Sequence, residues 1–326
     1  MYPFTFIQPK NTGEALAAFE QGSKFIAGGT NLVDLMKMNV EKPDSLINIS
    51  KLDLQKIEWL PNGNASIGSL VRNSDLAYDE SISKKFPVLS QALLAGASPQ
   101  LRNMATVGGN LLQRTRCPYF YDTEFACNKR TPGSGCAALN GYNRSHAILG
   151  GSDKCIATHP SDMCVALIAL DAIIHLQSAA GERIVAMKDF HLLPGQTPEK
   201  ETALAPGELI TSVEIPKKEY AYRSFYLKVR DRASFDFALA SAAVILSIQN
   251  NKIKAAHIGL GGVGTKPWHA SNAEKILIGN SPGDKIYQQA ASAALKDARI
   301  YQYNSFKKEL AIRTIVRALT TAGGIS

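Results

Sequence analysis

All five cysteines of this 326-residue chain lie in one segment, residues 105–164. The segment is rich in glycine, and it also holds a Gly-Gly-Asn turn at 108–110 and a Pro-Ser-Asp step at 160–162. Cysteines scattered at random would rarely gather so closely, so we expect this segment to fold around the chemistry of its thiols. An odd number of cysteines disfavours a disulfide framework, and metal or redox chemistry is the default interpretation.

The cysteine spacing leaves several interpretations open. Intervals of 9, 8 and 18 residues separate the first four thiols, Cys117, Cys127, Cys136 and Cys155. Structural zinc prefers close Cys-x2–4-Cys pairs, and the sequence has none. A [4Fe–4S] cluster needs four thiolates and tolerates open spacing when a loop wraps around it. The residues favour the cluster and leave zinc, disulfides and free thiols as alternatives.

Other polar and sulfur side chains surround these four cysteines. The basic residues beside them are expected to offset the negative charge of a thiolate cluster; they are Arg114, Arg116, Lys129 and Arg130. Cys164 lies in an apolar helical run, so we expect it in the core. His146 and His159 lack a paired metal-ligand spacing, and a structural role is predicted for both.

The charge of the chain does not predict a nucleic-acid surface. Its formal net charge is +8, but the basic residues are dispersed in runs no longer than pairs such as Lys84-Lys85. No apolar run reaches the roughly 20 residues that a membrane span needs. The first ten residues, MYPFTFIQPK, do not resemble a signal peptide. We therefore expect a globular protein that neither binds nucleic acid nor spans a membrane.

Hydrophobic periodicity predicts a mixed α+β chain. Strands are expected at 4–7, 24–27, 45–49, 56–60, 65–68, 172–176, 183–186, 208–215, 222–229 and 253–260. Helices are expected after Asn11 or Thr12 and at 32–36, 73–78, 88–94, 160–170, 286–298 and 307–321, with Pro160 in a first helical turn. In the last third, strands followed by helices on one face indicate an α+β domain.

The glycine pair Gly28-Gly29 joins a predicted strand to a predicted helix. Such a turn presents backbone N–H groups and the positive end of a helix dipole, which suits a pyrophosphate. Paired glycines also make ordinary left-handed turns, and the sequence here is not GxGxxG, so it does not predict a Rossmann fold.

Three motifs resemble those of the FAD-binding medium subunit of the xanthine dehydrogenase, or molybdenum hydroxylase, family. In chain order they are Ala27-Gly28-Gly29-Thr30-Asn31-Leu32, Thr106-Val107-Gly108-Gly109-Asn110-Leu111 and Pro160-Ser161-Asp162. Residues 228–238, with Gly261-Gly262-Val263 and Pro267-Trp268, resemble the C-terminal domain of the same subunits. The chain departs from the family at Asn31, where aspartate is common, and at His269, where arginine is usual.

The resemblance implies a two-part FAD-binding domain (PCMH-like) at 1–218, followed by a smaller α+β C-terminal domain like that of CO dehydrogenase flavoproteins at 219–326. An insertion at about 114–156 resembles the [4Fe–4S] loop of 4-hydroxybenzoyl-CoA reductase and, more closely, that of bacterial periplasmic aldehyde oxidoreductase flavin subunits. It implies a [4Fe–4S] cluster held by Cys117, Cys127, Cys136 and Cys155.

The resemblance also implies which residues would hold FAD. Two backbone cradles would surround its pyrophosphate, and polar side chains would contact phosphate, ribose or flavin; these residues are Ala27, Gly28, Gly29, Thr30, Asn31, Leu32, Thr106, Gly108, Gly109, Asn110, Ser161 and Asp162. Lys228 would place a positive charge near the flavin pyrimidine edge. Without the resemblance, Ser161-Asp162 would be a helix N-cap, and Lys228 could equally be a solvated strand lysine.

The family implies an electron-transfer role in a molybdenum-containing aldehyde oxidoreductase. Electrons would come from a molybdenum cofactor on a large subunit and two [2Fe–2S] clusters on a small subunit, and would leave FAD for an external acceptor. No catalytic residue is expected here, because the cofactors carry the chemistry. The alternatives are a 4-hydroxybenzoyl-CoA reductase-type subunit and, more distantly, a metal-stabilised nucleic-acid-binding module. The expected compartment is the periplasm by co-export with a partner, or the cytoplasm.

Overall fold

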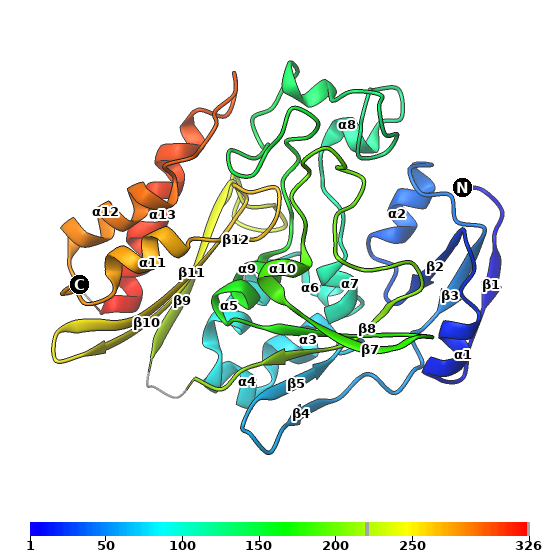
Figure 1. Cartoon of the computed structure of the whole chain (residues 1–326), viewed down its shortest axis with the longest axis horizontal. Helices are drawn as coiled ribbons and strands as arrows, with labels where there is room; N and C mark the ends of the chain where they lie inside the picture. The colour runs from blue at the N-terminus through cyan, green and yellow to red at the C-terminus, as the bar shows by residue number, and fades with distance from the viewer. Residues whose placement is uncertain (219–221, 325–326) are drawn as a thin grey trace.

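Three β-sheets with their covering helices build the chain in the computed structural model, which describes residues 1–218 and 222–324 (Figure 1). The first sheet is parallel, in the order β1 (Thr5–Ile7), β3 (Ser45–Asn48) and β2 (Ser23–Ile26). Its helices are α1 (Thr12–Ala17), capped by the Asn11 side chain, and α2 (Leu32–Lys37). Short crossovers through these helices explain why the three strands run parallel.

The second sheet is antiparallel and joins chain segments from both sides of the cysteine-rich insertion. Its order is β4 (Ile57–Trp59), β5 (Ala65–Gly68), β8 (Leu209–Ile215), β6 (Ile173–Ser178) and β7 (Gly181–Ala186). Strand β5, which precedes the insertion, pairs with β8, which follows it, and Ala65 lies opposite Ile215. The sheet is therefore continuous between the two segments that flank the insertion. The helices of this region are α3 (Asn73–Tyr78), α4 (Glu80–Lys85), α5 (Pro87–Ala95), α6 (Pro99–Arg102), α7 (Val107–Leu111) and α10 (Met187–Phe190).

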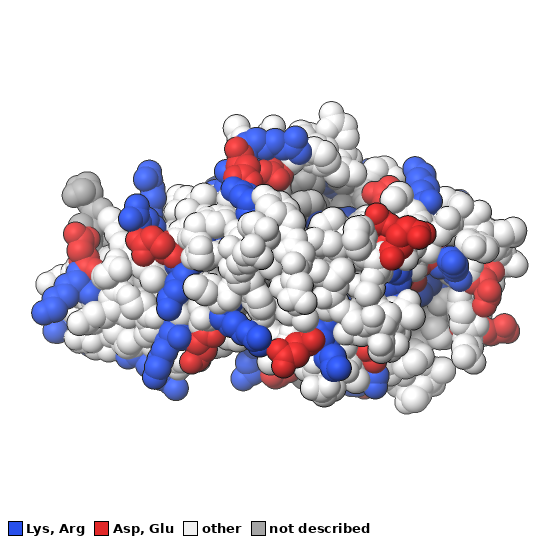
Figure 2. Space-filling view, turned by 90° about the horizontal axis from the view of Figure 1, so that it is seen from above, with Lys and Arg blue, Asp and Glu red and all other residues white. Residues whose placement is uncertain are grey.

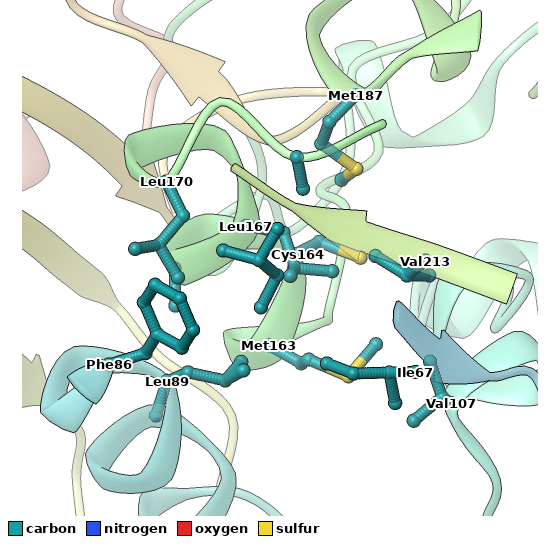
Figure 3. Packing of buried hydrophobic residues seen from close by; sticks show 14 of the residues in the cluster. Ile67, Phe86, Leu89, Val107, Met163, Cys164, Leu167, Leu170, Met187 and Val213 are labelled. Carbon is teal, nitrogen blue, oxygen red and sulfur yellow. The ribbon is translucent and has the colours of Figure 1, made fainter. Parts of the chain in front are cut away.

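Helix α9 (Asp162–Ala169) lies at the centre of the largest core, and each of its residues from Met163 to Ala169 is buried. A helix that is apolar on all sides belongs inside a protein. Figure 3 shows Met163, Cys164 and Leu167 of α9 among side chains from β5, α5 and β8. The prediction that Cys164 belongs to the core is confirmed, since its exposure is 0%.

The third sheet, in the order β12 (Trp268–His269), β11 (Lys252–Gly261), β10 (Ala240–Gln249) and β9 (Arg223–Val229), is antiparallel. Helices α11 (Ser271–Leu277), α12 (Asp284–Ala294) and α13 (Phe306–Gly323) cover one face of it (Figure 1). The other face packs on α9, where a Cβ at Gly259 would lie 2.2 Å from the Val165 carbonyl oxygen. The α+β prediction for the last third is confirmed.

The insertion is mostly irregular chain, drawn at the top of Figure 1, with the short helix α8 (Pro118–Tyr121) and a 3-10 turn, η1 (Ala137–Leu139). One guanidinium organises its first loop. Arg130 donates to the carbonyl oxygens of Tyr119 at 2.9 Å and Phe120 at 2.8 Å, and also to those of Thr123 and Phe125. These four carbonyl groups lie outside regular helices and strands or at a helix end, and Arg130 satisfies them as a hydrogen-bond donor. The same contacts fix the loop that carries Cys117.

The predicted elements are confirmed within a few residues, with one correction in α9. Sequence periodicity placed Pro160 in its first turn, but the helix begins at Asp162 and Ser161 is its N-cap. The Ser161 hydroxyl accepts the Cys164 N–H at 3.0 Å, which satisfies a first-turn donor, so the helix starts two residues later than predicted. Helices α4, α6, α7, α8, α10 and α11 and strands β10 and β12 were not predicted. The predicted 218/219 boundary adjoins residues 219–221, which lie outside the described part.

Charged side chains are mixed on the face shown in Figure 2, where Lys and Arg alternate with Asp and Glu. Within the described residues, no helix combines the length and apolar character that crossing a bilayer requires.

One polar contact in the third sheet predicts a pH-dependent stability. His269 Nε2 lies 2.9 Å from Glu274 Oε1, and this hydrogen bond raises the pKa of His269 above its usual 6.5. The pair therefore stabilises the fold fully below about pH 6.5, and the contribution is lost as pH rises through the raised pKa. We expect His269→Gln to lower the free energy of unfolding by up to about 1 kcal/mol at pH 6 and by almost nothing at pH 9.

Urea unfolding at both pH values measures this effect. Arg313→Gln is the matched control, because it removes an exposed pair with Glu309 whose arginine stays charged over this range. An equal loss from His269→Gln at pH 6 and pH 9 would contradict the prediction.

Candidate functional site

The two glycine turns found in the sequence meet at one cleft. Gly28 lies against the backbone before the second turn, and a Cβ there would be 1.9 Å from the Met104 carbonyl oxygen. Gly108 packs against Ser69, and a Cβ added at Gly108 would lie 3.1 Å from the Ser69 Cβ. The close packing of each turn against a neighbouring segment of the chain therefore favours glycine at these positions, whether or not a ligand is bound. The result is that residues of the two turns, far apart in sequence, line one cleft: Thr30 and Asn31 from the first, Gly109 and Asn110 from the second.

The two turns differ in the hydrogen bonds that they leave available. Within the described residues, the N–H groups of Gly28, Gly29, Thr30 and Asn31 donate no hydrogen bond. In the second turn, Gly108 N–H donates to the Ser69 carbonyl at 2.7 Å, and Gly109 N–H to Thr106 Oγ1 at 3.3 Å. Unpaired N–H groups in succession are what a phosphate recognises, so the first turn fits the pyrophosphate of FAD.

The cleft beside these turns has a volume of about 290 Å³, close to the smaller cofactor sites. Among the predicted residues, it is lined by Thr30, Asn31, Gly109, Asn110, Asp162 and Lys228. Sequence reasoning missed several of its residues: Asn73, Arg102, Gln113, Arg116, Arg232, Phe235 and Phe237. Arg102 is 8% exposed, and its Nη1 donates to the Gly96 carbonyl at 2.7 Å. A lone arginine in a four-residue helix leaves no sequence signal.

A buried ion pair joins α9 to β9, and both of its residues line the cleft. Lys228 Nζ lies 2.8 Å from Asp162 Oδ2, and the two side chains are 3% and 9% exposed. Lys228 also donates to the Ala95 carbonyl at 3.1 Å, and the Tyr226 hydroxyl donates to Asp162. Burial, with the Asp162 charge second, holds the pKa of Tyr226 well above 10. Lys228 is therefore not a solvated strand lysine, because it is held against a carboxylate.

Polar side chains connect the three motifs to one another. Ser161 donates its hydroxyl to Asn110 Oδ1 at 2.6 Å while also capping α9, so its predicted N-cap role is confirmed. Asn31 Oδ1 accepts the Arg114 N–H at 2.8 Å, and Asn31 Nδ2 donates to the Tyr121 hydroxyl at 3.3 Å. The first turn is thus tied directly to the start of the insertion.

The four predicted cysteines converge on one small cavity in the insertion, and all four line it. Cys117, Cys127 and Cys155 are buried, Cys136 is half-buried, and Cys127 forms a backbone bridge with Cys136. Burial raises the pKa of Cys117 to about 12 and that of Cys155 to about 11. These groups are therefore protonated thiols unless a metal displaces the proton.

The separation of the thiols distinguishes one metal ion from several. In a tetrahedral zinc site with Zn–S bonds of about 2.3 Å, the sulfur atoms lie about 3.8 Å apart. Among the described residues, no three of these thiols lie within 4.8 Å of one another. In the described part of the chain, these thiols are therefore not arranged as the ligands of a single zinc ion.

The basic residues beside the cysteines are less available than predicted. Arg114 pairs with Glu41 and with Glu201 at 2.5 Å, and Lys129 pairs with Glu201 at 2.9 Å. These carboxylates offset the charge of two of the four basic residues that were expected to face the thiols. The expectation holds best for Lys129, whose charge acts to lower the pKa of Cys155 against the larger effect of burial.

Three histidines make contacts that the sequence did not predict. His146 Nε2 lies 3.1 Å from Cys117 Sγ. His159 and His191 contact each other edge to face and, with Cys164, place three potential ligand atoms within 4.8 Å. Burial holds the pKa of His159 well below 6.5 and lowers that of His191 to about 4. The spacing along the chain could not reveal the contacts of His146 with Cys117 and of His159 with His191, because these partners lie 29 and 32 positions apart.

The chain matches two family models. The FAD binding domain in molybdopterin dehydrogenase covers residues 2–218, and the CO dehydrogenase flavoprotein C-terminal domain covers residues 225–322. The chain is 48% identical over 325 residues to the aldehyde oxidoreductase FAD-binding subunit PaoB of Escherichia coli (strain K12), with 99% of both chains covered. It is 31% identical over 297 residues to the glyceraldehyde dehydrogenase medium chain of Sulfolobus acidocaldarius, covering 90% of this chain and 88% of the relative.

Solved structures agree with this assignment. The cyanide-inactivated form of Cu,Mo-CO dehydrogenase contains a chain that superimposes with a TM-score of 0.78 at 25% identity, over 100% of both chains. Quinoline 2-oxidoreductase from Pseudomonas putida 86 has the same fold, with a TM-score of 0.76. Together with the glycine turns and the cleft between them, these matches show that the chain belongs to the FAD-binding medium subunits of the molybdenum hydroxylase family.

Proposed function

We propose that this chain is the electron-transfer flavin subunit of a molybdenum-containing aldehyde oxidoreductase. The observation that carries the proposal is the full-length, 48% identical relative named as the FAD-binding subunit of an aldehyde oxidoreductase. The cleft between the two glycine turns supports it, because Thr30 and Asn31, two of the residues whose N–H groups donate no hydrogen bond in the described part of the chain, line a cavity suited to a cofactor. FAD, when bound, would supply one- and two-electron chemistry.

Within the cleft, the residues take different proposed roles. Ala27 to Leu32 would hold the pyrophosphate through backbone N–H groups, and Thr106, Gly108, Gly109 and Asn110 would form the opposite side. Asp162 and Lys228 would meet the ligand as a pair, since each already satisfies the other. Thr30 would add a hydroxyl contact. Ser161 would not contact the ligand itself but would orient Asn110 through their hydrogen bond.

We also propose that Cys117, Cys127, Cys136 and Cys155 hold a [4Fe–4S] cluster. Their convergence on one small cavity supports this ligand set. Cys164 is excluded from it, because this residue of α9 lies in the core. Bonds from the four cysteines to metal would then stabilise the insertion, which has little regular secondary structure, together with its small apolar cluster.

The proposed assembly has three subunits. A large subunit would hold the molybdenum cofactor, a small one would hold two [2Fe–2S] clusters, and an external acceptor would receive the electrons. The compartment would follow the partner: the periplasm when the partner carries an export signal, and the cytoplasm when it does not. Residues 1–218 are proposed as the FAD-binding domain, with the insertion at about 114–156, and residues 219–326 as the C-terminal domain.

Metal and flavin analysis of the anaerobically purified chain tests the proposal. We expect bound FAD and about four iron atoms per chain, and we expect Cys127→Ser to lose most of the iron while it retains FAD. Cys164→Ser is the matched control, and it should keep both. A wild-type chain without flavin would overturn the flavin-subunit proposal, whereas flavin without iron, or zinc in its place, would overturn the cluster alone.

A further inference from the structure

One imidazole contacts the set of proposed cluster cysteines. His146 is 2% exposed, and its Nε2 lies 3.1 Å from the sulfur of Cys117, which is 8% exposed. Within the described residues, the other ring nitrogen, Nδ1, has no hydrogen-bond partner. The side chain is therefore committed to a single polar contact, and that contact is a cysteine sulfur.

The chemistry of a metal-bound thiolate fixes the direction of this hydrogen bond. A thiolate carries no proton, so Cys117 could act only as an acceptor once it binds metal. Nε2 of His146 must then carry the proton, whether the ring is neutral or charged, because an unprotonated nitrogen would face the sulfur with its lone pair. The contact thereby becomes an N–H···S hydrogen bond.

The backbone of His146 is held by residues from the far end of the chain. Its carbonyl oxygen accepts from Lys307 Nζ at 3.0 Å and from Asn304 Nδ2 at 3.4 Å. Lys307 is 0% exposed and also donates to the carbonyls of Ser145 and Gly262, at 3.0 and 2.5 Å. Three carbonyl oxygens around one buried ammonium fix the loop at residues 145–146, so the ring has little freedom to leave Cys117.

The contact lies on the side of the cysteine site that faces the flavin cleft. His146 and Cys117 both line a cavity of about 180 Å³, and Cys117 is the one member of the four cysteines on its wall. That cavity shares Arg116, Asp162 and Phe237 with the cleft described above. A hydrogen bond at this sulfur therefore acts on the thiolate nearest the proposed FAD site.

We propose that His146 is a hydrogen-bond donor to the Cys117 thiolate that raises the reduction potential of the iron–sulfur cluster, with Lys307 and Asn304 as its positioning residues. The inference rests on the proposed cluster. An N–H···S bond stabilises the more negative, reduced state, because it offsets part of the charge on sulfur. Removing the bond should therefore make the cluster harder to reduce.

Two amide substitutions separate this role from a structural one. Glutamine places its amide N–H about where histidine Nε2 lies, whereas asparagine is too short to reach the sulfur. We expect His146→Asn to lower the ratio of reduced to oxidised cluster about tenfold at a fixed potential, which is about 59 mV for a one-electron couple. His146→Gln should remain within about threefold of the wild type.

The measurement is a redox titration of the anaerobically purified chain, followed by the EPR signal of the reduced cluster, with iron and FAD assayed on each sample. His146→Leu serves as a second donor-free variant and should shift in the same direction as asparagine. Iron-loaded asparagine and leucine variants that titrate like the wild type would overturn the role of His146 and leave the cluster intact. A wild-type chain without iron would instead overturn the cluster, and this inference with it.

Discussion

Replacing Gly28 with alanine is expected to destabilise the fold and to remove most of the bound FAD. The new Cβ would lie 1.9 Å from the Met104 carbonyl oxygen, a distance that no side-chain rotation can relieve, because both groups belong to backbone. Overpacking usually costs about 1–3 kcal/mol, and a backbone clash belongs at the upper end. Separating the turns would also misplace the N–H groups of residues 28–31. We expect FAD affinity to fall at least tenfold, or about 1.4 kcal/mol.

The FAD-to-protein absorbance ratio and denaturant unfolding measure the two effects. Gly283→Ala is the matched control, since Gly283 has an extended backbone, φ 162°, and open space where its Cβ would lie. Its effect should stay within about 0.5 kcal/mol, as for an ordinary surface substitution. If Gly28→Ala retained FAD as the wild type does, the close contact of the two turns would not be what holds the site.

Replacing Lys228 with methionine is expected to lower the free energy of unfolding by about 3 kcal/mol. The substitution leaves the Asp162 carboxylate buried without its cation, and the Ala95 carbonyl without its donor. Removing one partner of a buried pair costs more than the pair itself contributes, because the remaining charge is not solvated. Since Lys228 lies in β9 and Asp162 in α9, the interface between α9 and the third sheet should loosen first.

A double variant distinguishes the unpaired charge from lost packing. Lys228→Met with Asp162→Asn should be more stable than Lys228→Met alone by about 1 kcal/mol or more, because no buried charge remains. Lys254→Met is the control, as an exposed lysine in β11 of the same sheet. A double variant no more stable than the single one would mean that packing, and not charge, accounts for the loss.

Local chemistry made much of the site predictable. Gly28-Gly29 and Gly108-Gly109 follow the rule that tight turns and close approaches require glycine, and both turns were found at the cleft. Ser161 has the side chain of an N-cap, and it caps α9. The confinement of all cysteines to one segment identified the insertion, and the four predicted thiols line one cavity.

The electrostatics of the site could not be predicted in the same way. Beside the cysteines, Arg114 and Lys129 looked free to offset thiolate charge, yet Glu41 and Glu201 pair with them from distant loops. Lys228 looked equally like a solvated lysine, and its burial follows from packing β9 against α5 and α9. The partners of a charged side chain depend on which helices, strands and loops pack together. The local sequence around the residue does not predict that packing.

By itself, the sequence determined the local elements of this protein: its alternating strands, its capped helices, its glycine turns and its set of thiols. These follow from backbone conformation and hydrophobic period, which act over a few neighbouring residues. Only the tertiary structure placed His146 against Cys117, His159 beside His191, and Lys307 under the insertion. Those contacts join residues about 30 to 160 positions apart, and the close packing of the elements in the tertiary structure decides them.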